Sequence, residues 1–158
     1  MATHHLSRSA YERLKAEHHD LSTRGRIEVA NKIETARLMG DLSENGDYHA
    51  AKDEQGHMEG RIRQLEHLLD PINHVIIEPG GDGSVRPGSV VAIVYDGDSD
   101  DMAERYLVGH PEEQTLHDIV SPQSPLGAAL LGRVDGDIVE YQGPRGMLKV
   151  KVIEVENA

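Results

Sequence analysis

The chain has 158 residues, a formal net charge of −12 and no cysteine. The lack of cysteine excludes disulfides and thiolate metal sites, and the negative charge opposes broad binding along a nucleic-acid backbone. Trp and Phe are absent, so the aromatic platforms on which single-strand binders stack bases are missing too. No secretory signal and no apolar run of the ~20 residues that a membrane helix needs are visible, so we expect a soluble, cytoplasmic protein.

Two long segments in the first half have the residue spacing of helices. Residues 10–39 contain no proline and only one glycine, Gly25. In this stretch, residues that are apolar or that a buried helix face tolerates recur at Tyr11, Leu14, His18, Leu21, Val29, Ile33 and Ala36. The second stretch alternates spacings of three and four, which is the seam of a coiled coil, at Tyr48, Ala51, Gln55, Met58, Ile62, Leu65 and Leu69. Pro71 ends this pattern.

The connection between these helices, residues 40–47, is called the tip below. Because short connections make neighbouring helices antiparallel, we expect a helical hairpin. A helix of thirty residues is roughly 45 Å long at ~1.5 Å per residue. A small second domain cannot cover the far end of such a rod, so we expect the tip to project into solvent.

The second half has the texture of a small antiparallel sheet. Turn clusters such as "EPGGDGS" and "YDGDSDD" separate the β-rich runs "SVVAIVY", "RYLVG", "DIVEY" and "LKVKVIEV". Within "SPQSPLGAALLG", Ser124 is placed to cap a short helix with Pro125 at its first position and Gly132 after its end. We therefore predict an α+β protein with a hairpin over residues 1–75 and a sheet domain over 76–158.

Asp41 and Glu44 give the tip its acidic character, and their roles can be explained in two ways. Asp41 as N-cap, with Glu44 three residues later, resembles a capping box, and both carboxylates favour a helix N-terminus. Alternatively, the two carboxylates complete a Mg²⁺ site in a partner, because two oxygen side chains alone do not fill the shell of a hydrated Mg²⁺. Carboxylates that share such a metal can also orient or deprotonate water in phosphodiester hydrolysis.

Two long motifs carry a family resemblance. "GDLSENGDYHAAKDEQ" (residues 40–55), followed by "EGRIRQLEHLL" (residues 59–69), resembles the signature of Gre-type bacterial transcript cleavage factors. "SPQSPLGAALLG" (residues 121–132) resembles the second signature of that family. With the hairpin and the terminal sheet, the resemblance spans nearly the whole chain.

The resemblance implies a coiled coil followed by an FKBP-like domain that docks at the secondary channel of bacterial RNA polymerase. The coiled coil would enter the channel, where Asp41 and Glu44 would hold a Mg²⁺ jointly with the polymerase and position water. The polymerase would then cut its own backtracked RNA near the 3′ end, so the chain would not be an enzyme alone. We expect a monomer that binds no cofactor in isolation and no membrane.

Further residues receive roles from the same resemblance. Ser43 and Asn45 would fix the tip through side-chain to backbone bonds, which is also their ordinary role in turns. Tyr48 belongs to the seam, although the family places an aromatic residue there near the nucleic acid. Arg37 and Lys52 would contact the RNA 3′ segment or lie on a solvated face. The loop at Ser124 and Pro125 would contact the polymerase.

Two other functions remain open. A Gre-like regulator could occupy the same channel and inhibit synthesis without stimulating cleavage, although both tip acids are kept here. An adaptor with a coiled coil and an FKBP-like binding module would not need the tip order Gly-Asp-Leu-x-Glu-Asn. Prolyl isomerase activity is disfavoured, because residues 76–158 offer neither Phe nor Trp for an aromatic-lined pocket.

Overall fold

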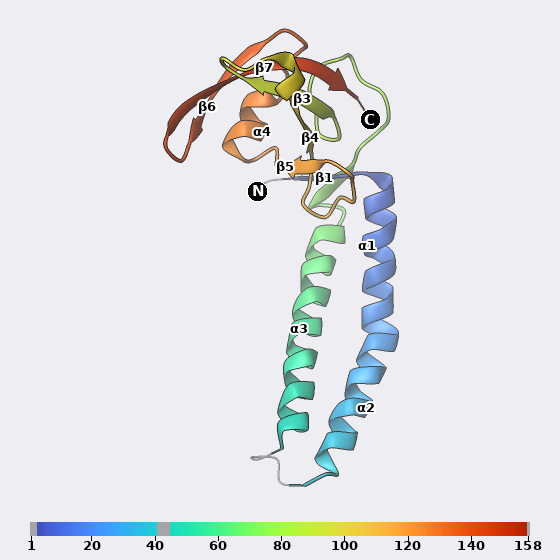
Figure 1. Cartoon of the computed structure of the whole chain (residues 1–158). Helices are drawn as coiled ribbons and strands as arrows, with labels where there is room; N and C mark the ends of the chain where they lie inside the picture. The colour runs from blue at the N-terminus through green and yellow to red at the C-terminus, as the bar shows by residue number, and fades with distance from the viewer. Residues whose placement is uncertain (1–2, 41–44, 158) are drawn as a thin grey trace. The chain divides into compact units, whose positions relative to one another are not determined.

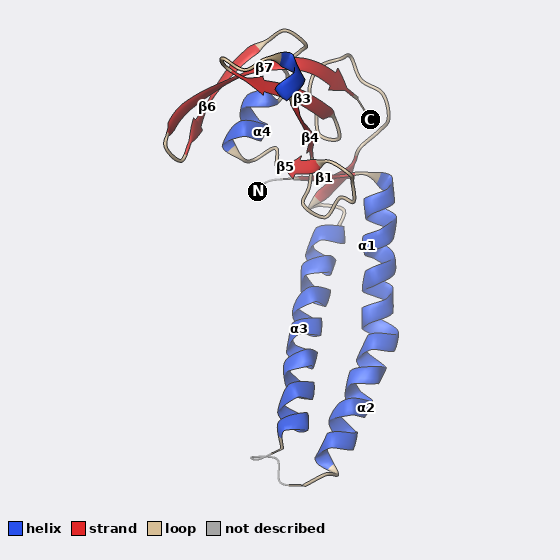
Figure 2. Ribbon diagram, viewed as in Figure 1, coloured by secondary structure: helices blue, strands red, loops and turns tan. Residues whose placement is uncertain are grey.

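The computed structural model describes residues 3–40 and 45–157 (Figure 1). The chain forms two compact units: a hairpin unit of residues 11–73, and a sheet unit of residues 1–10 together with 74–158. The structure confirms the predicted α+β class of a helical hairpin followed by a mostly antiparallel sheet (Figure 2). The units differ from the predicted ranges at the N-terminus, because the first residues pack with the sheet unit.

The hairpin consists of three helical segments and a π-helical turn. Helix α1 (Arg8–Asp20) leads through the π turn at Leu21–Gly25 into α2 (Arg26–Arg37), and α3 (Gly46–Leu69) returns. Helices α2 and α3 pack side by side (Figure 1). None of the helices in the described part of the chain is long and apolar enough to span a bilayer.

Much of the predicted seam forms the hairpin core, but at the end of α3 Leu68 is buried where the sequence predicted Leu69, which is half-buried. On the first side Leu14, Val29 and Ala36 are buried. On α3 the buried residues are Ala51, Ile62, Leu65 and Leu68, while Gln55 and Met58 are half-buried. Each fully buried Leu or Ile stabilises the fold by about 1.5–3 kcal/mol relative to exposure, so Leu14, Ile62 and Leu65 dominate this core.

Ion pairs join the two sides of the hairpin outside the seam. Glu17 accepts two hydrogen bonds from Arg61, at 2.7 and 2.9 Å, and these bonds hold the pKa of Glu17 below its usual value. Arg26 pairs with Glu59 in the same bidentate way. Ion pairs that remain partly exposed contribute only about 0–1 kcal/mol each, so these pairs help to select the register of the hairpin more than they add to its stability.

The sheet unit is built on five strands in the order β5-β4-β3-β7-β6. These are β3 (Val90–Tyr95), β4 (Glu104–Val108), β5 (Asp118–Val120), β6 (Ile138–Gly143) and β7 (Gly146–Glu156). All neighbours are antiparallel except β4 and β5, which are parallel. Strand β5 was not predicted, because its three residues are too few to show a period.

One face of this sheet carries the core, which helix α4 (Pro125–Leu130) helps to close. Leu130 of α4 is fully buried, and the strands contribute Val91, Ile93, Val108, Val139, Val150 and Val152. Beside this core the hydroxyls of Tyr95 and Tyr141 share a hydrogen bond at 3.0 Å. That bond, together with burial, raises the pKa of Tyr95 to about 12.

A second, two-stranded sheet pairs the two segments that flank the hairpin in sequence. Strand β1 (His4–Leu6) runs parallel to β2 (His74–Ile76), and Leu6 is fully buried. Just after β1, the backbone N–H and the hydroxyl of Ser7 donate hydrogen bonds to the Glu113 carboxylate at 2.8 and 2.6 Å. The Ser7 hydroxyl also accepts a bond from the Ala10 N–H, which caps the start of α1.

Candidate functional site at the end of the hairpin

Two helix ends bound the predicted site. Helix α2 ends at Arg37, and the chain continues through Gly40, whose φ of 146° lies in the region that glycine favours. The predicted acids Asp41 and Glu44, and the predicted supporting residue Ser43, lie outside the described residues. The structure therefore describes the two helix ends that residues 41–44 connect, and these ends are called the supports below.

Asn45 links these two supports. Its side-chain oxygen accepts a hydrogen bond from the Tyr48 N–H at 3.0 Å, which makes Asn45 the N-cap of α3. Its side-chain NH₂ donates to the carbonyl of Ala36 in the last turn of α2 at 2.5 Å. One side chain thus satisfies a free N–H at the start of α3 and adds a hydrogen bond to a carbonyl in the last turn of α2, which also accepts from the Met39 N–H at 3.1 Å. The prediction that Asn45 supports the tip through side-chain to backbone bonds is consistent with this geometry.

The capping box considered for Asp41 and Glu44 lies on residues outside the described part of the chain, but the N-cap of the following helix is a different residue. Helix α3 begins at Gly46, so its N-cap is Asn45, four positions later than a cap at Asp41 requires. Asn and Asp cap helices almost equally well, and local sequence alone did not distinguish the two positions. Asp47 lies in the first turn of α3, where the helix dipole favours its negative charge.

The predicted nucleic-acid contacts lie on both helices near the tip. Arg37 on α2 and Lys52 on α3 are both exposed, and Lys52 donates to the Gln55 side chain at 3.0 Å. Tyr48 is half-buried, and its ring meets that of His49 edge-on at 5.7 Å between centroids. The ring contact is with a neighbour on the same helix, so the place of Tyr48 in the seam stays a prediction.

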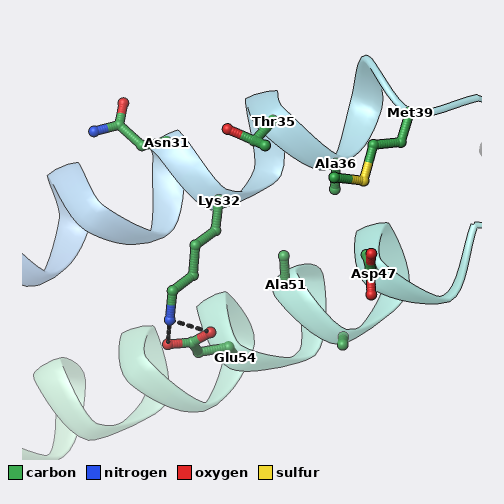
Figure 3. Close-up of a pocket in the computed structure, with 9 residues that line it drawn as sticks. Asn31, Lys32, Thr35, Ala36, Met39, Asp47, Ala51 and Glu54 are labelled. Atoms are coloured by element: carbon green, nitrogen blue, oxygen red, sulfur yellow. Dashed lines mark hydrogen bonds and ion pairs between the residues drawn. The ribbon is translucent and has the colours of Figure 1, made fainter.

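Next to the tip, a groove with a cavity volume of about 440 Å³ runs between α2 and α3. Small side chains on the two helices leave this space, namely Ala36, Ala50 and Ala51. Figure 3 shows the Met39 side chain beside Ala36 at one end, and Lys32 reaching across to both oxygens of Glu54 at the other. Sequence reasoning missed this groove, although paired alanines on facing helices were its visible signal.

Two large apolar side chains at the end of α2 are exposed. Leu38 is 80% exposed and Met39 65% exposed. They stand beside Arg37, where the sequence predicts contact with RNA. On the α2 side of the tip, the positive charge of Arg37 is therefore flanked by exposed apolar surface.

Ser124 and Pro125 lie in the sheet unit, at the start of α4. The Ser124 hydroxyl accepts a hydrogen bond from the Gly127 N–H at 3.1 Å and donates to the Ser121 carbonyl at 2.7 Å. Pro125 occupies the first turn of the helix. The predicted helix-start role of both residues is confirmed, and a contact with a partner remains a prediction.

The metal chemistry predicted for this chain concerns the tip acids. Within residues 3–40 and 45–157, no group of three or more His, Asp or Glu side chains is placed to hold a metal ion. Asp41 and Glu44 carry hard carboxylate oxygens, the donor type that Mg²⁺ prefers, but two such groups supply only part of its six-ligand shell. The donor set fits a Mg²⁺ that is shared with a partner.

Comparisons with known proteins cover almost the whole chain. Residues 4–73 match the family described as "Transcription elongation factor, N-terminal", and residues 80–157 match "Transcription elongation factor, GreA/GreB, C-term". The chain is 46% identical over 153 residues to a transcription elongation factor GreA of Streptomyces avermitilis, covering 96% of this chain and 92% of that protein. It is 44% identical to the GreA of Saccharopolyspora erythraea over 154 residues, covering 96% and 93%.

Among solved structures, the chain is similar to the GreA factor homolog Gfh1 of Thermus thermophilus. The two are 27% identical, with coverage of 98% of this chain and 99% of the other, and the TM-score is 0.44.

Proposed function

This chain belongs to the GreA/GreB family of transcription elongation factors, and we propose that it stimulates cleavage of backtracked RNA by bacterial RNA polymerase. In this proposal the hairpin enters the secondary channel of the polymerase, and Asp41 and Glu44 reach the catalytic centre. The polymerase supplies the catalytic site. The chain adds two carboxylates and is not a nuclease by itself.

The observation that carries the proposal is the Asn45 link between the ends of α2 and α3. Only four residues, 41–44, separate Gly40 from Asn45, and two of them are acids. Because the segment has only four residues, its length would restrict the two carboxylates to the neighbourhood of the hydrogen-bonded supports at its ends. Such restriction is what a group needs to act at a site that another protein completes.

The tip acids would serve the reaction in two ways. Their oxygens would supply ligands to a Mg²⁺ held jointly with the polymerase, which provides Lewis acidity and a more acidic water. One carboxylate would accept a hydrogen bond from the attacking water and orient it toward the phosphodiester. The cleavage produces a new RNA 3′ hydroxyl, from which the polymerase resumes elongation.

Arg37 and Lys52 would hold the RNA 3′ segment during this step. Both are exposed, and they project from opposite helices beside the tip. A phosphate contact by each would position the RNA without reading its sequence, since phosphate contacts carry no base information. The exposed side chains of Leu38 and Met39 carry no charge, so we expect the tip to bind RNA with modest affinity.

The sheet unit would dock on the polymerase through the loop that begins α4. Ser124 is committed to the Gly127 N–H and the Ser121 carbonyl, which gives residues 121–127 a defined shape. This loop would therefore present a preformed surface to the polymerase. In the absence of polymerase, the chain would be a monomer.

A cleavage assay on stalled, backtracked polymerase tests the proposal. Wild-type protein should accelerate Mg²⁺-dependent shortening of the RNA, and it should leave free RNA intact. Asp41→Ala and Glu44→Ala should each lose the acceleration while binding the polymerase as wild type does. Asp53→Ala, an exposed acid further along α3, is the matched control and should stay active.

Each other outcome points elsewhere. If wild-type protein slows nucleotide addition and does not stimulate cleavage, the chain is an inhibitory regulator of the channel. If Asp41→Ala retains full stimulation, the tip acids do not act at the catalytic centre and the proposal is wrong.

A further inference from the structure

The first side of the hairpin is not one continuous α-helix. Between α1 and α2, residues Leu21–Gly25 form a π-helical turn. The N–H of Arg26 donates to the carbonyl of Leu21, five residues earlier, where an α-helix would use the residue four positions earlier. A π turn of this kind contains one residue more than the α turn it replaces.

The spacing of the seam shows where the extra residue lies. From α1 to the first residue of the π turn the seam runs through Leu14, His18 and Leu21, with steps of four and three. The same alternation continued through Gly25 would place Glu28, Lys32 and Thr35 in the seam, and all three are exposed. The observed seam uses Val29, Ile33 and Ala36, each one position later, of which Val29 and Ala36 are buried and Ile33 half-buried.

The side chains of the turn suit this interruption. The Ser22 hydroxyl donates to the carbonyl of His18 at 2.7 Å, and the Thr23 hydroxyl donates to that of His19 at 2.6 Å. These hydroxyls donate to backbone carbonyls beside the π turn, where the regular series of α-helical hydrogen bonds is altered. Ser and Thr hydroxyls that bond back to their own helix in this way also favour a bend. Gly25 faces α3 closely, since a Cβ there would lie 3.1 Å from the Met58 sulfur.

We propose that the chain carries one residue beyond its coiled-coil repeat between Leu21 and Val29, and that the π turn is a joint that absorbs it. The joint returns α2 to the seam, so that Lys32 reaches Glu54 and the Ala36 carbonyl reaches Asn45. Both contacts thus depend on a correction made earlier on the same side of the hairpin, about two turns before Lys32 and about three turns before Ala36. This inference concerns the hairpin itself and does not rest on the cleavage proposal.

Deletion of Ile27 tests the inference in the full chain. Ile27 is 64% exposed, and its removal moves Val29, Ile33 and Ala36 back by one position while Gly25 stays opposite Met58. The seam then has uninterrupted steps of three and four, and the π turn can become α-helix. The matched control is deletion of His57, which is exposed on α3, where the seam is already regular.

The two deletions should differ in stability. The Ile27 deletion should keep the helical circular dichroism of wild type and melt at the same temperature or higher. The His57 deletion misaligns the two halves of α3 and should lower the midpoint of the helical transition by about 5 °C or more. If the Ile27 deletion lowers the midpoint as much as the His57 deletion, no surplus residue exists.

Amide hydrogen exchange provides a second test of the joint. Because the turn lacks a regular α-helical ladder, the amides of residues 22–26 should exchange about tenfold faster than those of α1 and α2 on either side. In the Ile27 deletion they should slow to the rate of their neighbours. Amides in wild type that exchange as slowly as the flanking helices would show that the turn is not a joint.

Discussion

The side chain of Asn45 donates a hydrogen bond to the carbonyl of Ala36, nine residues earlier, while the same side chain caps α3 through the Tyr48 N–H. The two bonds use different atoms of one amide. Aspartate at this position would keep the acceptor and lose the donor, and alanine would lose both. The hairpin end therefore offers a pair of substitutions that separates capping from linking.

We expect Asn45→Ala to destabilise the hairpin by about 1–2 kcal/mol, the usual cost of a lost N-cap. Asn45→Asp should keep most of the stability, because a carboxylate also caps a helix and suits its dipole. Both variants should lower the rate of polymerase-dependent RNA cleavage, since both lose the bond to the Ala36 carbonyl. Thermal unfolding and the cleavage assay measure the two effects separately. Full activity in Asn45→Asp would mean that the link to α2 is not needed.

Acid should weaken the hairpin through Glu17. The pKa of Glu17 is held below its usual value, first by its hydrogen bonds with Arg61, so the folded state favours the ionised carboxylate. The stabilisation is present above the unfolded pKa of about 4.3 and is lost as pH falls through the lower folded value. Glu17→Gln should be less stable than wild type at pH 7, and this difference should shrink as the pH is lowered toward 3. Denaturant unfolding at several pH values measures it, and a constant difference would contradict the assignment.

Gly127→Ala should disrupt the loop that starts α4. A Cβ at Gly127 would lie 1.9 Å from the Ser121 carbonyl oxygen, so the backbone of residues 121–127 has to move. Overpacking of this kind costs about 1–3 kcal/mol. The exposed neighbour Ala128→Gly is the control, and it should cost about 1 kcal/mol or less through helix propensity alone. Unfolding followed by tyrosine fluorescence reports mainly on the sheet unit, which holds three of the five tyrosines, and equal losses in the two variants would refute the close contact.

Removal of the charge on Arg37 or Lys52 should reduce cleavage in a salt-dependent way. Each lost phosphate contact should lower the steepness with which added salt weakens the RNA interaction, by about one unit of logarithmic slope. Cleavage rates measured from low to moderate salt for Arg37→Ala, Lys52→Ala and wild type give this slope. Arg13→Ala, at the other end of the hairpin sequence, provides a comparison for general charge effects. Unchanged slopes would place the RNA elsewhere.

The hairpin was predictable because its signal is local and repeated. Ile62 and Leu65 occupy the positions that a three-four alternation requires, and both are fully buried. The π turn was hidden in the same pattern. The predicted seam already contained the step of eight residues from Leu21 to Val29, where the three-four alternation requires seven. A single irregular step does not stand out, because helical patterns commonly contain residues that depart from the ideal spacing.

Features that join distant segments were beyond the sequence pattern. Strand β1 has three residues, two of them histidine, and becomes a strand only because His74–Ile76 lies beside it. The sequence pattern placed the end of the hairpin within residues 40–47 and offered Asp41 as one candidate cap, but Asp41 and Asn45 are both good capping residues. Only the position of the first α3 turn distinguishes them.

The pairing of His4 with His74 also constrains the order in which the chain acquires its structure. Parallel neighbours require a long crossover, and here the entire pair of long helices serves as that crossover. Bringing ends so far apart together in a flexible chain has a high entropic cost, which falls once the intervening segment has doubled back on itself. We therefore expect the helices to associate before β1 joins β2, so that the N-terminal strand is among the last parts of the chain to be secured.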